Sequence, residues 1–178
     1  MGISITQKLC KIIHQGGLWS PRGKRDKMGI IEMVKTIKKV ERKSIILIEI
    51  GKFIYSYGKD AYIISYIFNY KIKILTENNN TYVCAFPRDK LKKIMATLEN
   101  KKINYLVLDR KNNYREDEKY DNKNLNRYDE YLEKSVTYVK RKNQIEEINN
   151  YLIKEIDNEG IEQTIFKIKQ IINERRKI

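Results

Sequence analysis

Seven consecutive residues combine side chains that can bind nucleic acid. They read Gly51-Lys52-Phe53-Ile54-Tyr55-Ser56-Tyr57. A lysine can contact a phosphate, and an aromatic ring can stack on a base or wedge into a base step. The alternative is that Phe53 is an ordinary core residue, since phenylalanine is usually buried. We predict that this segment is the functional site, with Lys52, Phe53 and Tyr55 as its binding residues.

Catalytic and metal-binding chemistry lacks the residue patterns that it needs. The sequence offers no nucleophilic side chain paired with a general base. It also lacks the Asp or Glu and Lys pattern that nucleases carry on paired strands. Cys10 and Cys84 are far apart and His14 is the single histidine, so no zinc site or disulfide framework follows. The carboxylates at 116–118 lie among lysines and are interpreted as solvated charges. We predict no enzyme activity, no metal and no cofactor.

The charge of the chain favours a polyanionic partner. Lys and Arg number 37 against 23 Asp and Glu, for a net charge of +14. The net charge is +8 over residues 1–60, +5 over 61–125 and +1 over 126–178. Binding to nucleic acid is largely electrostatic, so the gradient predicts that nucleic acid meets the first two thirds of the chain. A biased composition without functional meaning is the alternative.

Two basic groups could extend the site along a nucleic-acid backbone. One is the polar face of a helix over 27–42, continued by Lys43, and the other is a basic segment over 18–27. The second group resembles a phosphate-binding P-loop, but its spacing is one residue too long and Arg25 replaces the magnesium-binding Ser or Thr. A solvated surface is the alternative for both groups. The candidate phosphate contacts are Lys38, Lys39, Arg42, Lys43, Arg22, Lys24 and Arg25.

The site must be positioned by an apolar strand that comes directly before it. Residues 45–50 read Ile-Ile-Leu-Ile-Glu-Ile, which is typical of a strand buried on both faces. Residues 51–57 then follow at the edge of the sheet. Helical spacing or alternation predicts further elements at 27–42, 59–68, 71–75, 81–86, 87–100 and 103–108. We therefore predict an α/β fold, a mixed sheet of four to six strands flanked by helices, followed by a C-terminal helical hairpin.

Four segments follow from these patterns: a basic arm at 1–27, the α/β domain at 28–110, a charged linker at 111–126 and the helical hairpin at 127–178. The linker is Asn-rich and poor in apolar residues. Each hairpin helix has an apolar stripe, so the hairpin must pack on the domain or on a partner. No apolar run reaches the length of a membrane span or signal segment, which predicts a reduced, cytoplasmic location away from membranes.

The segment around the site resembles the mismatch-recognition domain of the MutS family. That family carries an apolar strand followed by a motif close to G-D-F-Y-E-L-F-x-D-D-A, and Gly51, Phe53, Asp60 and Ala61 match it in register. The resemblance continues at 85–87, Ala-Phe-Pro, where the family has G-V-P. It implies that Phe53 stacks on a mispaired base. At the position of the family's base-binding glutamate stands Tyr55, which can stack or donate a hydroxyl but cannot act as a carboxylate.

The resemblance implies a non-catalytic protein that binds duplex DNA, RNA or a hybrid, including distorted or mismatched duplexes. The family's clamp and ATPase parts do not appear in the sequence, so the protein would act as an accessory to another enzyme. Small MutS-like proteins accompany the reverse transcriptases of diversity-generating retroelements, and such an enzyme could bind the C-terminal helices. The alternative is a protein-interaction scaffold without direct nucleic-acid recognition.

Overall fold

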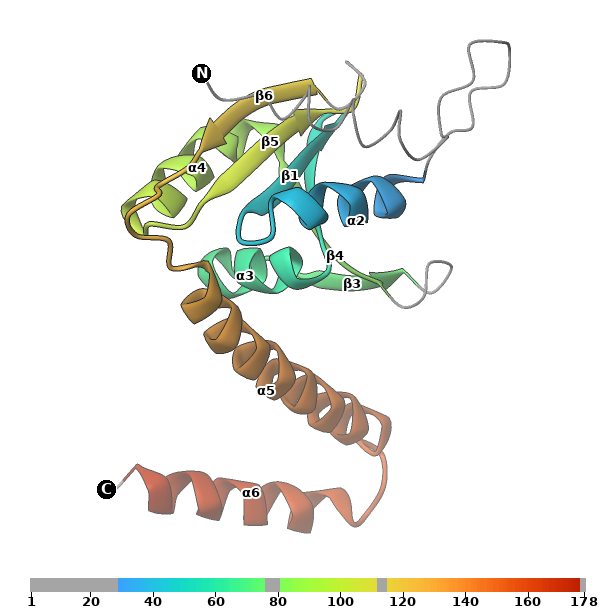
Figure 1. Ribbon diagram of the computed structural model, residues 1–178. Helices are drawn as coiled ribbons and strands as arrows, with labels where there is room; N and C mark the ends of the chain where they lie inside the picture. Colours follow the sequence, from blue (N-terminus) through green and yellow to red (C-terminus); the bar gives the residue numbers. More distant parts are fainter. Residues whose placement is uncertain (1–28, 76–80, 112–114, 177–178) are drawn as a thin grey trace. The chain divides into compact units, whose positions relative to one another are not determined.

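The computed structural model (Figure 1) describes residues 29–75, 81–111 and 115–176. In these ranges the chain forms one six-stranded sheet in the order β3-β4-β2-β1-β5-β6, with five α-helices and one short 3₁₀ helix, η2. The strands are β1 (Ile45–Ile50), β2 (Phe53–Tyr57), β3 (Ile72–Leu75), β4 (Thr81–Pro87), β5 (Tyr105–Asp109) and β6 (Arg115–Tyr120). The helices are α2 (Ile30–Val40), α3 (Lys59–Phe68), η2 (Arg88–Lys90), α4 (Leu91–Asn100), α5 (Tyr128–Lys154) and α6 (Ile161–Arg175).

Strand β1 is an inner strand with both faces buried. It pairs antiparallel with β2 and parallel with β5, so the sheet is mixed. Ile45 and Leu47 pack with α3 and α4 on one face, while Ile46 and Ile48 pack with α2 on the other. Alternate side chains of a strand point to opposite faces, and here each face finds a helix to cover it. The predicted fold class, a mixed sheet flanked by helices, is confirmed.

The prediction that residues 51–57 follow the strand at the edge of the sheet is wrong. Residues 53–57 form β2, which lies inside the sheet between β1 and β4. A loop of two residues, Gly51 and Lys52, returns the chain from β1 to β2. Gly51 has a φ of +65°, and a glycine in the first loop position is what a tight antiparallel hairpin of this length favours. The apolar run and the aromatic segment are thus two halves of one hairpin.

The prediction of a linker at 111–126 is also wrong, because β6 lies within it. β6 pairs antiparallel with β5 and extends the sheet to a sixth strand. Its charged composition is compatible with a strand because an edge strand needs a partner on one side only. The Tyr120 ring stacks on Tyr105 at 5.9 Å between centroids, and the Lys119 ammonium lies 3.0 Å from the Glu41 carboxylate.

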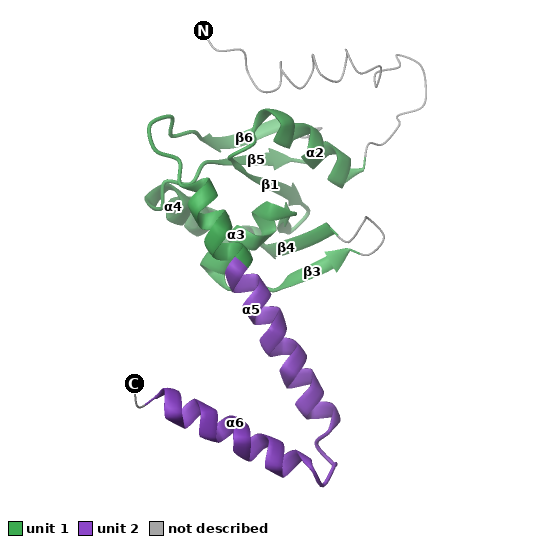
Figure 2. Cartoon of the chain, turned by 60° about the horizontal axis from the view of Figure 1, so that its bottom comes forward, with its two compact units in different colours: residues 1–136 green, residues 137–178 purple. Residues whose placement is uncertain are grey.

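The chain divides into two compact units, residues 1–136 and 137–178 (Figure 2). The first turns of α5 belong to the first unit, where Tyr128 and Tyr131 are buried in the core shared with α3 and α4. The second unit contains the rest of α5 and all of α6. The prediction of two C-terminal helices is therefore confirmed. Many of its large apolar side chains are exposed to solvent.

Candidate nucleic-acid interface

Phe53 and Tyr55 lie side by side on one face of β2. Residues two apart on a strand share a face and are about 7 Å apart along it. Tyr55 is half-buried against the cluster under α2, and its ring stacks on that of Tyr57 with centroids 6.3 Å apart. Phe53 is the first residue of the strand and is 46% exposed, so it is not a core residue. Its ring is available to a ligand at the end of the sheet.

Hydrogen bonds fix the loop that presents Phe53. Phe53 is paired with Ile50 across the β1–β2 hairpin and with Pro87 on β4. The Arg88 backbone N–H donates to the Lys52 carbonyl at 3.0 Å, which ties the hairpin loop to the start of η2. An inner strand cannot shift without breaking pairs on both sides, so the aromatic ring is held on a rigid support.

Two arginines outside the predicted set of binding residues border the same end of the sheet. Arg88 follows β4, and its Nε lies 3.0 Å from the Glu49 carboxylate. Arg110 follows β5, and its N–H donates to the Glu49 carbonyl at 3.3 Å. β1 and β5 are parallel, so the residues that follow them meet at one edge. The parallel pairing of β1 with β5 is the signal that locates Arg110. The Ala-Phe-Pro of residues 85–87, which matches the family motif, is the signal that locates Arg88, the next residue.

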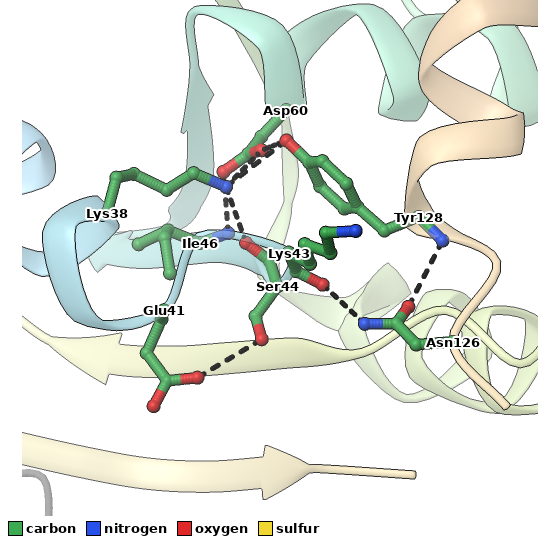
Figure 3. A network of polar contacts seen from close by, with 8 residues as sticks. All are labelled: Lys38, Glu41, Lys43, Ser44, Ile46, Asp60, Asn126 and Tyr128. Atoms are coloured by element: carbon green, nitrogen blue, oxygen red, sulfur yellow. Dashed lines mark hydrogen bonds and ion pairs between the residues drawn. The ribbon is translucent and has the colours of Figure 1, made fainter. Parts of the chain in front are cut away.

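Lys38, predicted as a phosphate contact, has its ammonium engaged by three groups of the first unit. Its ammonium donates to the Asp60 carboxylate at 2.8 Å, to the Ser44 carbonyl at 2.8 Å and to the Tyr128 hydroxyl oxygen at 3.2 Å (Figure 3). Asp60 is only 1% exposed and also accepts a hydrogen bond from the Ile46 N–H at 3.0 Å. A cation held by three internal acceptors serves the fold rather than a phosphate.

The same network fixes the start of α5. The Tyr128 hydroxyl donates to Asp60, and burial together with the Asp60 charge raises the pKa of Tyr128. The hydroxyl therefore keeps its proton and remains a donor at neutral pH. Asn126 adds a second connection, since its side-chain amide donates to the Lys43 carbonyl at 2.7 Å (Figure 3). Helices α2, α3 and α5 are thus joined at the beginning of β1.

The remaining predicted basic residues fall at the opposite end of β1 or outside the described residues. Lys39, Arg42 and Lys43 are exposed, and the Lys43 ammonium pairs with the Asp129 carboxylate on the surface. They precede β1, whereas Lys52 and Phe53 follow it, and the length of the strand separates the two groups by about 20 Å. Their role as phosphate contacts stays a prediction. Arg22, Lys24 and Arg25 lie outside the described residues.

Neither nearby carboxylate stands in for the glutamate that Tyr55 replaces. Asp60 is buried and engaged by Lys38 and Tyr128. Glu49 is paired in register with Ile54, whose side chain belongs to the cluster under α3 and α4. Side chains at paired positions share a face, so Glu49 points to the face opposite Phe53 and Tyr55. The aromatic pair therefore has no acidic neighbour on its own strand or on β1.

These features define the described first unit as an α/β domain with an aromatic pair, Phe53 and Tyr55, at one end of its mixed sheet. Within the described residues, no group of His, Cys, Asp and Glu could hold a metal ion, and no helix is long and apolar enough to cross a membrane. Comparison with known protein families matches residues 28–143, 116 of the 178, to MutS domain I. The chain belongs to the MutS family, and domain I is its N-terminal mismatch-recognition domain. A search of curated proteins gave no match.

Proposed function

We propose that the end of the sheet around Phe53 binds nucleic-acid duplexes and holds them at a deformable base step. The half-exposed Phe53 ring stacks on or wedges between bases, while Lys52, Arg88 and Arg110 contact the phosphates on either side. The observation that carries the proposal is an exposed phenylalanine at the end of a rigid inner strand, bordered by basic residues. Wedges of this kind partly unstack a base step and bend the duplex.

The protein would act by binding and would leave the chemistry to another enzyme. MutS domain I is a recognition domain, and the match of that family covers residues 28–143. A reverse transcriptase or a repair enzyme would meet an imperfect DNA, RNA or hybrid duplex and is the class of partner that we propose. Titration of matched and mismatched DNA, RNA and hybrid duplexes in a gel-shift assay would test the proposal and identify the preferred duplex. Absence of binding to every duplex would favour the scaffold alternative.

We expect little preference for a mismatch over a bulged or otherwise flexible duplex. Stacking by Phe53 and Tyr55 responds to how easily a step deforms, whereas hydrogen bonds to base edges read base identity. The missing glutamate is not replaced by Glu49 or Asp60, which are engaged elsewhere. Competition between a single-base bulge and each of the mispairs measures the preference. A strong preference for one particular mispair would contradict this prediction.

The rim of basic residues should set the salt dependence of binding. Replacement of all three residues, Lys52, Arg88 and Arg110, by glutamine in one variant should weaken binding to duplexes of every sequence. It should also flatten the dependence of log K on log salt by roughly 0.9 for each phosphate that is no longer neutralised. The matched control removes the same charge from α6 by the exchange of Lys167, Lys169 and Arg175 for glutamine, since these residues are exposed in the second unit. Equal effects of the two triple variants on the slope would mean that net charge, and not this rim, binds the duplex.

A further inference from the structure

The second compact unit cannot bury its own apolar side chains. It contains 42 residues, 137–178, which is close to the size below which a chain needs a partner or cross-links to form a core. Ile145, Ile148 and Ile156 are 68%, 56% and 64% exposed, and α6 adds Ile165, Phe166 and Ile172. This surface needs an occupant.

We propose that the occupant is a second copy of this chain, packed antiparallel along the end of α5. Within α5 the apolar stripe consists of Ile145, Ile148 and Leu152, and its spacing of three and four residues becomes four and three when it is read backwards. An antiparallel copy therefore sets Ile145 beside Leu152 and brings the two Ile148 side chains near each other. Such a symmetric interface buries the same stripe on both copies, as two-fold dimers require.

Charge complementarity selects a second copy over a partner of one charge sign. The stripe is preceded on α5 by three consecutive cations, Lys140 to Lys142, and it is followed, in the turn after α5, by Glu155, Asp157 and Glu159. In the antiparallel arrangement the cations of each copy lie at the same end as the anions of the other. A parallel copy or a uniformly acidic or basic partner would instead bring like charges together at one end.

The unit as a whole also has the charge of a self-associating surface. Residues 137–178 carry nine basic and seven acidic side chains, whereas residues 1–60 carry thirteen basic and five acidic. Two copies of the nearly neutral unit can approach without the repulsion that the basic α/β domain would cause. The dimer would present two Phe53 sites, which raises the effective concentration of the second site once the first is bound.

Charge reversal on the full chain tests this proposal. One variant carries Lys140→Glu, Arg141→Glu and Lys142→Glu, and the other carries Glu155→Lys, Asp157→Lys and Glu159→Lys. Sedimentation velocity at micromolar concentration should give a dimer for the unchanged chain and a monomer for each variant alone. An equimolar mixture of the two variants should restore the dimer, because their reversed ends complement each other.

The controls separate self-association from a loss of folding. Circular dichroism of both variants should match that of the unchanged chain, since all six residues flank the stripe and lie outside the core of the first unit. Ile148→Asp should also yield a monomer by placing a charge in the stripe. The proposal fails if the unchanged chain sediments as a monomer, which would leave the stripe to a different protein. It also fails if the reversed variants dimerise as well as the unchanged chain does.

Discussion

Replacement of Phe53 by alanine is expected to weaken duplex binding by about 1–3 kcal/mol, or roughly 5- to 150-fold in Kd, which is the usual value of an aromatic side chain stacked on a base. The melting temperature of the protein should hardly change, because the ring is half-exposed at the end of β2 and its loss leaves no buried cavity. Fluorescence anisotropy with a bulged duplex and a thermal melt of the same variant measure both quantities.

Two further substitutions test whether the loss of affinity in Phe53→Ala is due to the loss of stacking. Phe53→Trp keeps a flat aromatic surface and should retain most of the affinity. Ile74→Ala removes another exposed apolar side chain, this one from the edge strand β3, and should leave the affinity unchanged. If Phe53→Ala instead lowered the free energy of unfolding by about 3–5 kcal/mol, the ring would be a core residue and the wedge would be excluded.

Replacement of Asp60 by alanine should lower the free energy of unfolding by about 3–5 kcal/mol, as expected when one partner of a buried ion pair is removed. Asp60 joins three parts of the first unit, because it accepts hydrogen bonds from Lys38 on α2, from the Ile46 N–H on β1 and from Tyr128 on α5. Its loss leaves the Lys38 ammonium without its counterion and the buried Tyr128 hydroxyl without its acceptor. Urea denaturation of the variant measures the change.

A double-mutant cycle tests whether the pair acts as a unit. Lys38→Met with Asp60→Asn should cost less than the sum of the two single substitutions, since the double variant leaves no unpaired charge. Lys39→Met is the matched control, because Lys39 is exposed on the same helix, and it should change stability by no more than about 0.5 kcal/mol. Additive effects of Lys38 and Asp60 would show that their contact contributes little.

The sequence predicts most of the sheet because hydrophobic periodicity reports burial directly. The run at 45–50 is apolar on both faces, and the structure covers both faces with helices. The sequence does not show β2 as a separate strand, because its aromatic residues begin only two residues after β1 ends. Strands β1 and β2 therefore read as one strand with an irregular end. β6 was missed because an edge strand with Lys119 and Glu116 shows no apolar alternation.

Some residues of the candidate site can be proposed from local sequence motifs, whereas others depend on contacts between distant parts of the chain. Phe53 and Tyr55 are proposed from the sequence because the motif that contains them is continuous, and their role in binding stays a prediction. Lys38 was assigned to the surface because helical periodicity places it among lysines, and only the fold reveals the buried Asp60 that it meets. Arg110 enters the site through the parallel pairing of β1 with β5, whose partners are about sixty residues apart. Such long-range pairings leave no local signal.

Photo-crosslinking tests most directly whether nucleic acid binds at the Phe53 end of the sheet. A duplex carrying 5-iodouracil at a bulge would be irradiated with the protein, digested with trypsin and analysed by mass spectrometry. Residues 53–59 form one tryptic peptide, since Lys52 precedes it and Lys59 ends it. We predict that the modified base is attached to this peptide and that Phe53→Ala reduces the yield. Attachment only to peptides of α5 or α6 would contradict the account.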